Sequence, residues 1–150
     1  MIKYAGIGAR KDVPESVQRQ CELLATLLGA RGFQLNSGQS GETDLAFEAG
    51  AVKIKAPYRY RVPTLWEPAL AHAARYHFDR WSLYDEAEQT RFASLSMIIH
   101  GDHFDDPVHF IVCYHPGETV PSVAEGFPVF NLFDDPGAAK LWAWIGAQGW

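Results

Sequence analysis

The first of two glycine-bearing turns combines residue types that suit phosphate binding. It has the sequence Gly6-Ile7-Gly8-Ala9-Arg10 and follows a short apolar run. Where a strand turns into a helix, backbone N–H groups point toward a bound anion, and glycine lets a phosphate approach the backbone closely. The planar guanidinium group of Arg10 would add two parallel donors. The alternative is a tight turn in which glycine serves backbone geometry alone.

The second turn offers hydroxyl, amide and backbone donors. Its sequence is Ser37-Gly38-Gln39-Ser40-Gly41-Glu42-Thr43-Asp44. These groups suit a phosphate or a ribose, so both turns are candidate ligand-binding segments. The alternative is a helix N-cap, a role that Ser40, Thr43 or Asp44 would each fill. The two interpretations are compatible with each other.

Two carboxylates follow the second turn, and one histidine follows a later apolar run. Asp44 and Glu48 are four residues apart, which places them on one face of a helix. There they could act as general acid and base or polarise a ribose hydroxyl, although a structural role is the alternative. His115 and Pro116 directly follow the apolar run 108–114, where a histidine could contact a base or a phosphate. A buried structural histidine is the alternative.

Two further groups of residues favour structural roles. The segment from His100 to His109 is rich in histidine and aspartate, which are zinc-ligand types, but we interpret it as a solvated acidic turn at the opposite edge of the sheet. We therefore expect no metal and no cofactor. The aromatic residues of the segment 58–84 could stack on bases, but packing is the more common role. Those aromatic residues are Tyr58, Tyr60, Trp66, Trp81 and Tyr84.

The elements that must position these residues alternate between strand and helix. We expect the segment 57–68, which holds three prolines, to be a packed loop. The expected strands are 2–7, 33–36, 51–56, 108–114 and 128–133, and the expected helices are 14–28, 43–50, 69–78, 82–99 and 138–145. Alternation of this kind predicts an α/β fold, a Rossmann-like parallel sheet of about five strands with helices on both faces.

A parallel sheet would bring the candidate residues together. Ligands of such sheets bind at the carboxyl ends of the strands, near the point where the strand order reverses. The first, second and fourth expected strands end at 6–10, 37–41 and 115–117. We therefore expect these three loops to gather at one edge of the sheet.

Composition bounds the choice of partners and compartment. The chain has 150 residues, which fits one domain over 1–150, and its formal net charge is −5. General duplex DNA binding is not expected, because that affinity depends on a basic face, although Lys53, Lys55, Arg59 and Arg61 form a local basic stretch. Cys21 and Cys113 fit apolar patterns and predict buried thiols. With no apolar leader and no run long enough for a membrane span, we expect a cytoplasmic protein.

The ordered set of these motifs resembles a known family, the SLOG superfamily. The resemblance is carried by Tyr4-Ala5-Gly6-Ile7-Gly8-Ala9-Arg10, Leu35-Asn36-Ser37-Gly38, the segment from Asp44 to Ala51, Phe110 to Pro116, and Pro128 to Leu132. This Rossmann-like group includes the DNA-processing protein DprA and the Lonely Guy enzymes. The chain is most similar to the small stand-alone members that are frequent in bacteriophages, and the segment 57–95 matches least.

The resemblance implies a nucleotide-type ligand and a homodimer, but the chain departs from the family pattern in its loops. The second turn of the family usually has the sequence Ser-Gly-Gly-Ala-x-Gly-Ala-Asp, whereas this chain has Gln39, Ser40 and Glu42, and its glycine comes one place earlier at Gly41. The family's glycine-rich turn after the fourth strand is shortened here to residues 117–123. The Lonely Guy motif Gly-Gly-x-Gly-Thr-x-x-Glu is absent.

Three hypotheses about function follow from these observations. The first is a non-catalytic module that binds a nucleotide or a nucleotide derivative, sensing or sequestering a nucleotide signal. The second is a nucleotide N-glycosidic hydrolase or transferase that uses Glu48 and Asp44. The third is a DprA-like module that interacts with single-stranded DNA or with protein and binds no nucleotide.

Overall fold

A five-stranded parallel sheet forms the centre of the molecule. The computed structural model describes residues 1–117, 120–134 and 137–150. The strand order is β3-β2-β1-β4-β5, and every neighbouring pair is parallel. The strands are β1 (Lys3–Gly8), β2 (Gln34–Ser37), β3 (Tyr58–Tyr60), β4 (Phe110–Tyr114) and β5 (Val129–Asn131). The chain thus builds outward from β1 to β3, returns to the other side of β1, and places the reversal of strand order between β1 and β4.

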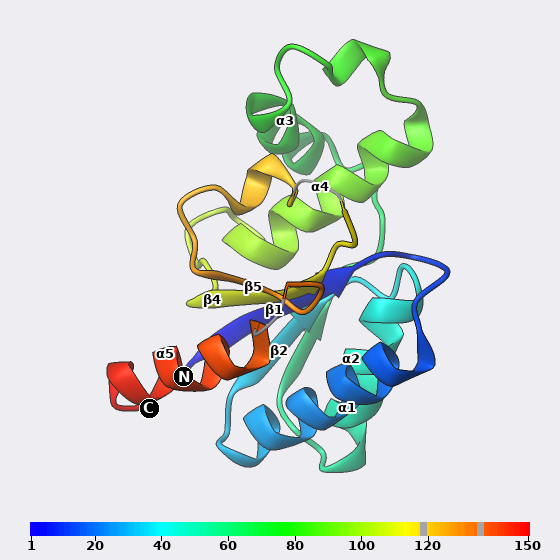
Figure 1. Cartoon of the computed structure of the whole chain (residues 1–150). Coiled ribbons are helices and arrows are strands. Elements are labelled where there is room, and N and C mark those ends of the chain that lie inside the picture. The colour runs from blue at the N-terminus through cyan, green and yellow to red at the C-terminus, as the bar shows by residue number, and fades with distance from the viewer. Residues whose placement is uncertain (118–119, 135–136) are drawn as a thin grey trace.

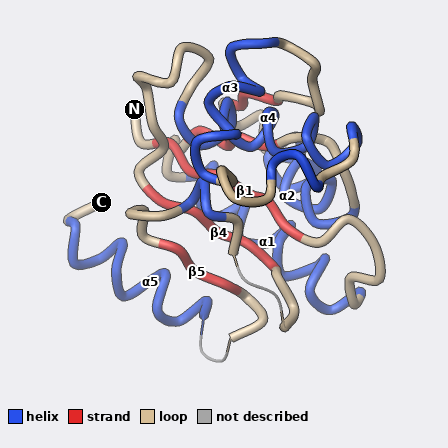
Figure 2. The backbone as a smooth tube through the Cα atoms, turned by 90° about the horizontal axis from the view of Figure 1, so that it is seen from above, coloured by secondary structure: helices blue, strands red, loops and turns tan. Residues whose placement is uncertain are grey.

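Helices cover both faces of the sheet (Figure 1). One face carries α1 (Glu15–Ala30), α2 (Glu42–Lys53) and α5 (Gly137–Gln148), and the other carries α3 (Glu67–Tyr76), α4 (Glu86–His100) and the short helix η2 (Ser122–Ala124). The short helix η1 (Trp81–Leu83) connects α3 to α4. Seen from above, α5 runs alongside β5 at the edge of the sheet (Figure 2). The predicted α/β, Rossmann-like architecture is confirmed.

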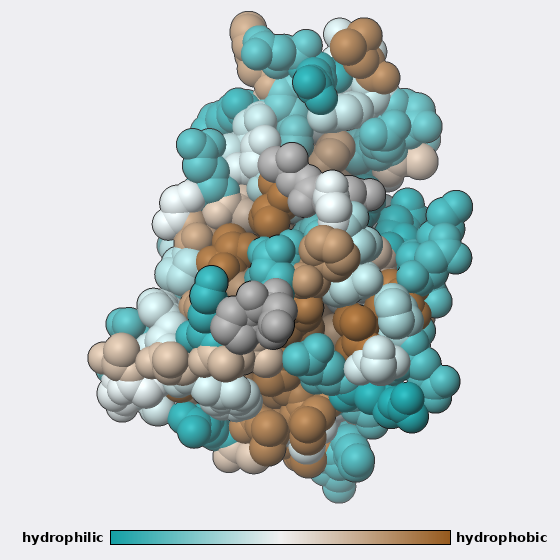
Figure 3. Space-filling model, in the orientation of Figure 1, coloured by the Kyte–Doolittle hydropathy of each residue, from teal (hydrophilic) through white to brown (hydrophobic). Residues whose placement is uncertain are grey.

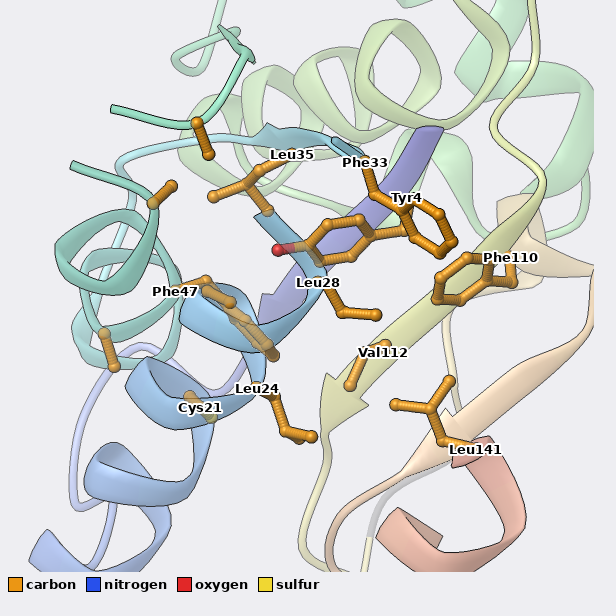
Figure 4. Close-up of a cluster of buried hydrophobic side chains, with 14 of the residues drawn as sticks. Tyr4, Cys21, Leu24, Leu28, Phe33, Leu35, Phe47, Phe110, Val112 and Leu141 are labelled. Atoms are coloured by element: carbon orange, nitrogen blue, oxygen red, sulfur yellow. The ribbon is translucent and has the colours of Figure 1, made fainter. Parts of the chain in front are cut away.

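Side chains of β1 and β4 point alternately to the two faces of the sheet and so contribute to two separate cores. Tyr4 of β1 and Phe110 of β4 face α1 and α2, whereas Ala5 and Ile111, one residue further on, face α4. This period of two is what a strand that is buried on both faces requires. On the first face the rings of Tyr4 and Phe110 stack at 5.5 Å between centroids, surrounded by Leu28, Leu35 and Phe47 (Figure 4).

The two cysteines contribute to these cores as buried thiols. Cys21 packs in the core below α1 and Cys113 in the core below α4, and both are free. Burial raises the pKa of each thiol to about 12, so neither is a thiolate at neutral pH. The prediction of small buried apolar residues at both positions is confirmed.

The predicted third strand at 51–56 is wrong. Helix α2 continues through this stretch to Lys53, and the strand β3 lies further on, at 58–60, inside the segment interpreted as a loop. The alternation of Val52 and Ile54 with lysines resembled a half-buried strand, but Val52 is 65% exposed at the end of the helix. Helix α2 extends because it packs closely against α1 at Gly50, a tertiary contact that local alternation does not reveal.

The other predicted elements are present with shifted ends. The predicted helix at 69–78 is α3, and the one at 82–99 begins only after Asp85, whose side chain accepts a hydrogen bond from the Glu88 amide at 2.8 Å. Ser82 lies in η1 and is not the cap. Within the described residues, no helix combines the length and apolarity needed to cross a bilayer.

The contact between α1 and α2 predicts opposite effects for two glycine substitutions. A Cβ atom at Gly50 would collide with the carbonyl oxygen of Glu22 and lie 2.8 Å from Cβ of Ala25, whereas a Cβ at Gly146 in α5 meets nothing within 4 Å. We expect Gly50→Ala to lower the free energy of unfolding by about 1–3 kcal/mol through overpacking. Gly146→Ala should raise it by about 0.5–1 kcal/mol through helix propensity. Urea unfolding measures the change in unfolding free energy of each variant. If both substitutions stabilise the protein, the packing argument is wrong.

Candidate functional site

The ends of β2, β1 and β4 are held together at the carboxyl edge of the sheet. The Ala9 amide donates to the Tyr114 carbonyl at 2.9 Å, and Ser37 Oγ donates to the Gly6 carbonyl at 2.7 Å. A Cβ at Gly8 would lie 2.6 Å from the Tyr114 oxygen and 2.8 Å from Thr43 Cγ2. Gly8 is therefore required by the close approach of two chain segments.

The two glycine-bearing turns lie side by side, as their positions in the sequence predict. Thr43 Oγ1 donates to the Ala9 carbonyl at 2.7 Å, and the Glu42 amide donates to the Arg10 carbonyl at 2.9 Å. Arg10 Nε in turn donates to the Ser40 carbonyl at 2.9 Å. At Gly41 a Cβ would collide with the Arg10 backbone. The first amides of α2, which would otherwise be donors for an anion, are thus bonded to carbonyl groups of the first turn.

The second turn surrounds a carboxylate of the protein itself. Asp44 Oδ2 accepts hydrogen bonds from the Ser40 amide at 3.1 Å and from Ser40 Oγ at 2.8 Å, and the Gly38 amide also donates to this side chain. Asp44 is 3% exposed, and its burial raises its pKa, whereas these donors and the charge of Arg91 oppose that rise. The turn therefore binds a carboxylate where we expected a phosphate.

Glu48 lies behind this turn as a second buried carboxyl group. It is 6% exposed and receives hydrogen bonds from the backbone and side chain of Gln39, which has a φ of 53°. Burial, and then the charge of Asp44, raise the pKa of Glu48 to about 7. Its Oε1 atom is buried and has no hydrogen-bond partner among the described residues. Glu48 is therefore largely protonated below neutral pH.

A small hollow lies where the turns meet α4 and the end of β4. Its volume is about 10 Å³, which is enough for a single water molecule. Neither Gln39 nor Glu42 lines it; the Glu42 carboxylate instead lies 3.5 Å from the Val13 amide. The hollow is lined by Ile7, Gly8, Ser40, Asp44, Arg91, Leu95 and His115.

A much larger cavity of about 630 Å³ shares Arg91 and His115 with the hollow. Its outer wall is the end of α3 and the turn that follows, and its inner wall is α4. It is lined by Arg75, Tyr76, His77, Phe78, Asp79, Arg80, Tyr84, Arg91, Phe92, His115, Val120, Pro121 and Ser122. Of these residues, the sequence motifs predicted only His115 as a binding residue, and Tyr84 was considered for base stacking.

His115 is a predicted site residue that lines both the small hollow and the large cavity. It is 4% exposed, and its backbone exchanges two hydrogen bonds with the side chain of Asn131, at 3.0 and 3.1 Å. Asn131 thereby links the end of β4 to the end of β5. Pro116 follows but lines neither space. Of the shortened turn 117–123, Glu118 and Thr119 lie outside the described residues.

The histidine- and aspartate-rich turn lies at the amino edge, opposite these spaces. The His109 amide donates to the carbonyl of Lys3 at the start of β1, and Lys3 Nζ pairs with Asp106. Arg59 and Arg61 of the basic stretch both pair with Asp102, so one carboxylate compensates part of their combined charge. Among the described residues, no group of three or more ligand-type side chains could hold a metal ion.

The aromatic residues of the segment 58–84 divide between two environments. Tyr58 and Tyr60 stack on each other at 4.5 Å between centroids in β3. Trp81 and Tyr84 lie 6.4 Å apart beside the large cavity, and only Tyr84 lines it. Packing therefore accounts for Tyr60, whereas Tyr58 is 61% exposed and Tyr84 adds an aromatic ring to the cavity wall.

The fold and these spaces define an α/β protein with a small hollow at the topological switch point of its sheet and a larger cavity beside it. Comparison of the chain with protein-family models, curated proteins and solved structures gives no match in any of the three. The geometry of the described residues therefore carries the functional argument.

The raised pKa of Glu48 predicts a specific pH dependence of stability. A carboxyl group whose pKa is higher in the folded state contributes stability below its ordinary value of 4.5, and this contribution is lost as pH rises through about 7. The wild type should lose about 2–3 kcal/mol of unfolding free energy between pH 4 and 8 as Glu48 ionises, and Glu48→Gln should abolish this loss. We therefore expect the unfolding free energy of the variant minus that of wild type to rise by this amount from pH 4 to pH 8.

The exposed residue Glu125 provides the matched control. Glu125→Gln should leave the shape of the stability profile unchanged in the same chemical denaturation series. Profiles of wild type and Glu48→Gln that run parallel from pH 4 to 8 would show that the Glu48 carboxyl group is not perturbed.

Proposed function

We propose that this chain binds a nucleotide or a nucleotide-derived ligand at the carboxyl edge of its sheet and does not turn the ligand over. The observation that carries the proposal is the cavity of about 630 Å³ beside His115, at the switch point between β1 and β4. Open parallel sheets bind their ligands at this point. The proposal includes membership in the SLOG superfamily, whose motifs place the same loops at this edge.

The size and lining of the cavity support a ligand of this class. Small-molecule sites commonly have volumes of roughly 300–1,000 Å³. Arginine forks suit phosphate oxygens, and aromatic rings such as those of Tyr84 and Phe92 suit a base or a sugar. A nucleotide combines these two chemistries in one molecule.

The positions of the carboxyl groups support binding without catalysis. Asp44 is engaged by the donors of Ser40 and Gly38, and Glu48 lines neither the hollow nor the cavity. A general acid must come within hydrogen-bond reach of the bond that it protonates. The N-glycosidic hydrolase that the carboxylate pair suggested is therefore the weaker alternative.

A homodimer formed through helices is part of the same proposal. Leu23 and Leu27 of α1 are 57% and 43% exposed, and Leu45 and Val52 of α2 are 53% and 65% exposed. An apolar patch is visible over the C-terminal half of α1 (Figure 3). A contact between two copies would remove these side chains from water.

Ligand binding should appear as a rise in melting temperature. At a free concentration of about 100 Kd, a ligand adds about 2.7 kcal/mol of stability, which for a chain of this size is a shift of roughly 5–10 °C. We expect at least one nucleotide from a panel of mononucleotides, dinucleotides and cyclic nucleotides to produce it. Chromatography after incubation should recover that nucleotide intact. Release of free base would favour the hydrolase, and salt-sensitive binding of single strands with no nucleotide shift would favour the DprA-like module.

His115→Ala tests whether the ligand occupies this edge. We expect it to weaken binding of the stabilising nucleotide by about 5- to 50-fold, because the ring lines both spaces and its loss removes a contact. His103→Ala, at an exposed position in the turn at the amino edge, is the matched control and should bind as wild type does. Equal affinity of the two variants, measured by calorimetry, would place the ligand elsewhere.

A further inference from the structure

The large cavity gathers arginines in an acidic chain. Three arginines, Arg75, Arg80 and Arg91, line it together with one carboxylate, Asp79. The net charge of the whole chain is −5, so this excess of positive charge runs against the composition. Burial lowers the pKa of His77, which also lines the cavity, so the arginines supply the positive charge on the outer wall.

Four other cationic side chains form ion pairs within the described residues. Lys3 pairs with Asp106, Arg59 and Arg61 pair with Asp102, and Arg19 pairs with Glu15. Within residues 1–117, 120–134 and 137–150, neither Arg75 nor Arg80 lies within ion-pair distance of a carboxylate. In the part of the chain that the structure describes, these two exposed guanidinium groups are therefore open to an anionic ligand.

Arg91 connects the cavity to the glycine-bearing turns. It lies on α4, lines both the cavity and the small hollow, and donates to the Gly8 carbonyl at 3.4 Å. Its charge also opposes the rise in the pKa of Asp44. The inner end of the cavity therefore has a guanidinium group held in place by the loop edge, and the outer end has two that are exposed to solvent.

Hydrogen bonds and ring contacts within the chain hold the wall that carries Arg80. The Arg80 amide donates to the His77 carbonyl at 3.0 Å, and the Leu83 amide donates to the Arg80 carbonyl at 2.9 Å. The ring of His77 packs on Phe92 of α4 at 4.0 Å between centroids, and that of Tyr84 packs on Phe92 at 5.0 Å. A preformed wall lowers the entropy cost of ordering charged side chains on binding.

We propose that this cavity binds the phosphate groups of the ligand, and that the ligand is a nucleotide with two or more phosphates. This inference rests on the proposed function. Arg91 contacts the inner phosphate, and Arg75 and Arg80 contact the outer phosphates. The glycine-bearing turns do not bind phosphate, because the first amides of α2 are bonded to carbonyls and those of Gly38 and Ser40 to Asp44.

Calorimetry with a phosphate series tests the inference. The probes are adenosine and guanosine, their mono-, di- and triphosphates, and inorganic pyrophosphate. For at least one of the two bases, we expect affinity to rise by about fivefold or more with each added phosphate up to the diphosphate. The double variant Arg75→Gln/Arg80→Gln should lose this rise and bind the diphosphate about tenfold or more weakly than wild type. Arg19→Gln on α1 is the matched control and should bind as wild type does.

The outcomes separate this inference from the proposed function. Because Arg75 and Arg80 are exposed, the double variant should melt as wild type does in the absence of ligand. If nucleosides and nucleotides bind equally, or if the double variant keeps full affinity, the phosphate site is overturned and nucleotide binding stands. If only pyrophosphate binds, and does so only with the arginines present, the phosphate site stands and the proposed function fails. If wild type binds none of the probes, the inference is overturned.

Discussion

The buried carboxylate of Asp44 determines what the carboxyl edge of this sheet can do. It takes hydrogen bonds from Gly38 and Ser40, which would otherwise be free to hold an anion, and it lies near the guanidinium group of Arg91. Each of these donors is thereby already bonded to a group of the protein itself. An incoming phosphate would therefore have to displace the carboxylate together with its donors. The large cavity opens beyond Arg91, at the same edge of the sheet.

The connection between β3 and β4 creates that cavity. It contains α3, η1 and α4, and it crosses from the outer strand β3 to the inner strand β4 over one face of the sheet. Because β4 pairs directly with β1, this connection has to pass the switch point (Figure 1). Arg75 and Arg80 come from its outer part and Arg91 from its inner helix, so residues 16 positions apart in the chain lie around one space. The excess positive charge follows from this arrangement and not from any local basic run.

The sequence predicted those parts of the fold and of the site whose pattern lies within a few neighbouring residues. The strands β1, β2 and β4 and the helices α1, α4 and α5 follow from apolar runs and periodicities that act within a few residues. The convergence of the turns at 6–10 and 37–44 follows from parallel topology, which alternation predicts. The sequence did not predict where α2 ends, because that position depends on the contact of Gly50 with α1. The sequence did not predict the cavity arginines either, since they are spread over α3, the turn that follows it and α4, whose polar residues look like ordinary solvated surface.

The substitutions in the second turn have a consistent physical explanation. Gln39 occupies a left-handed conformation with a φ of 53°, where glycine is the cheapest residue, so a side chain at this position carries a conformational cost. Gln39 also contributes hydrogen bonds that lower the pKa of Glu48. Glu42 does not project into the hollow but lies against the Val13 amide, before the start of α1. Both side chains therefore lie within contacts of the edge and outside the hollow. Because the amides of Gly38, Ser40, Glu42 and Thr43 are bonded within the chain, a ligand at this edge is better recognised by the arginines that line the large cavity.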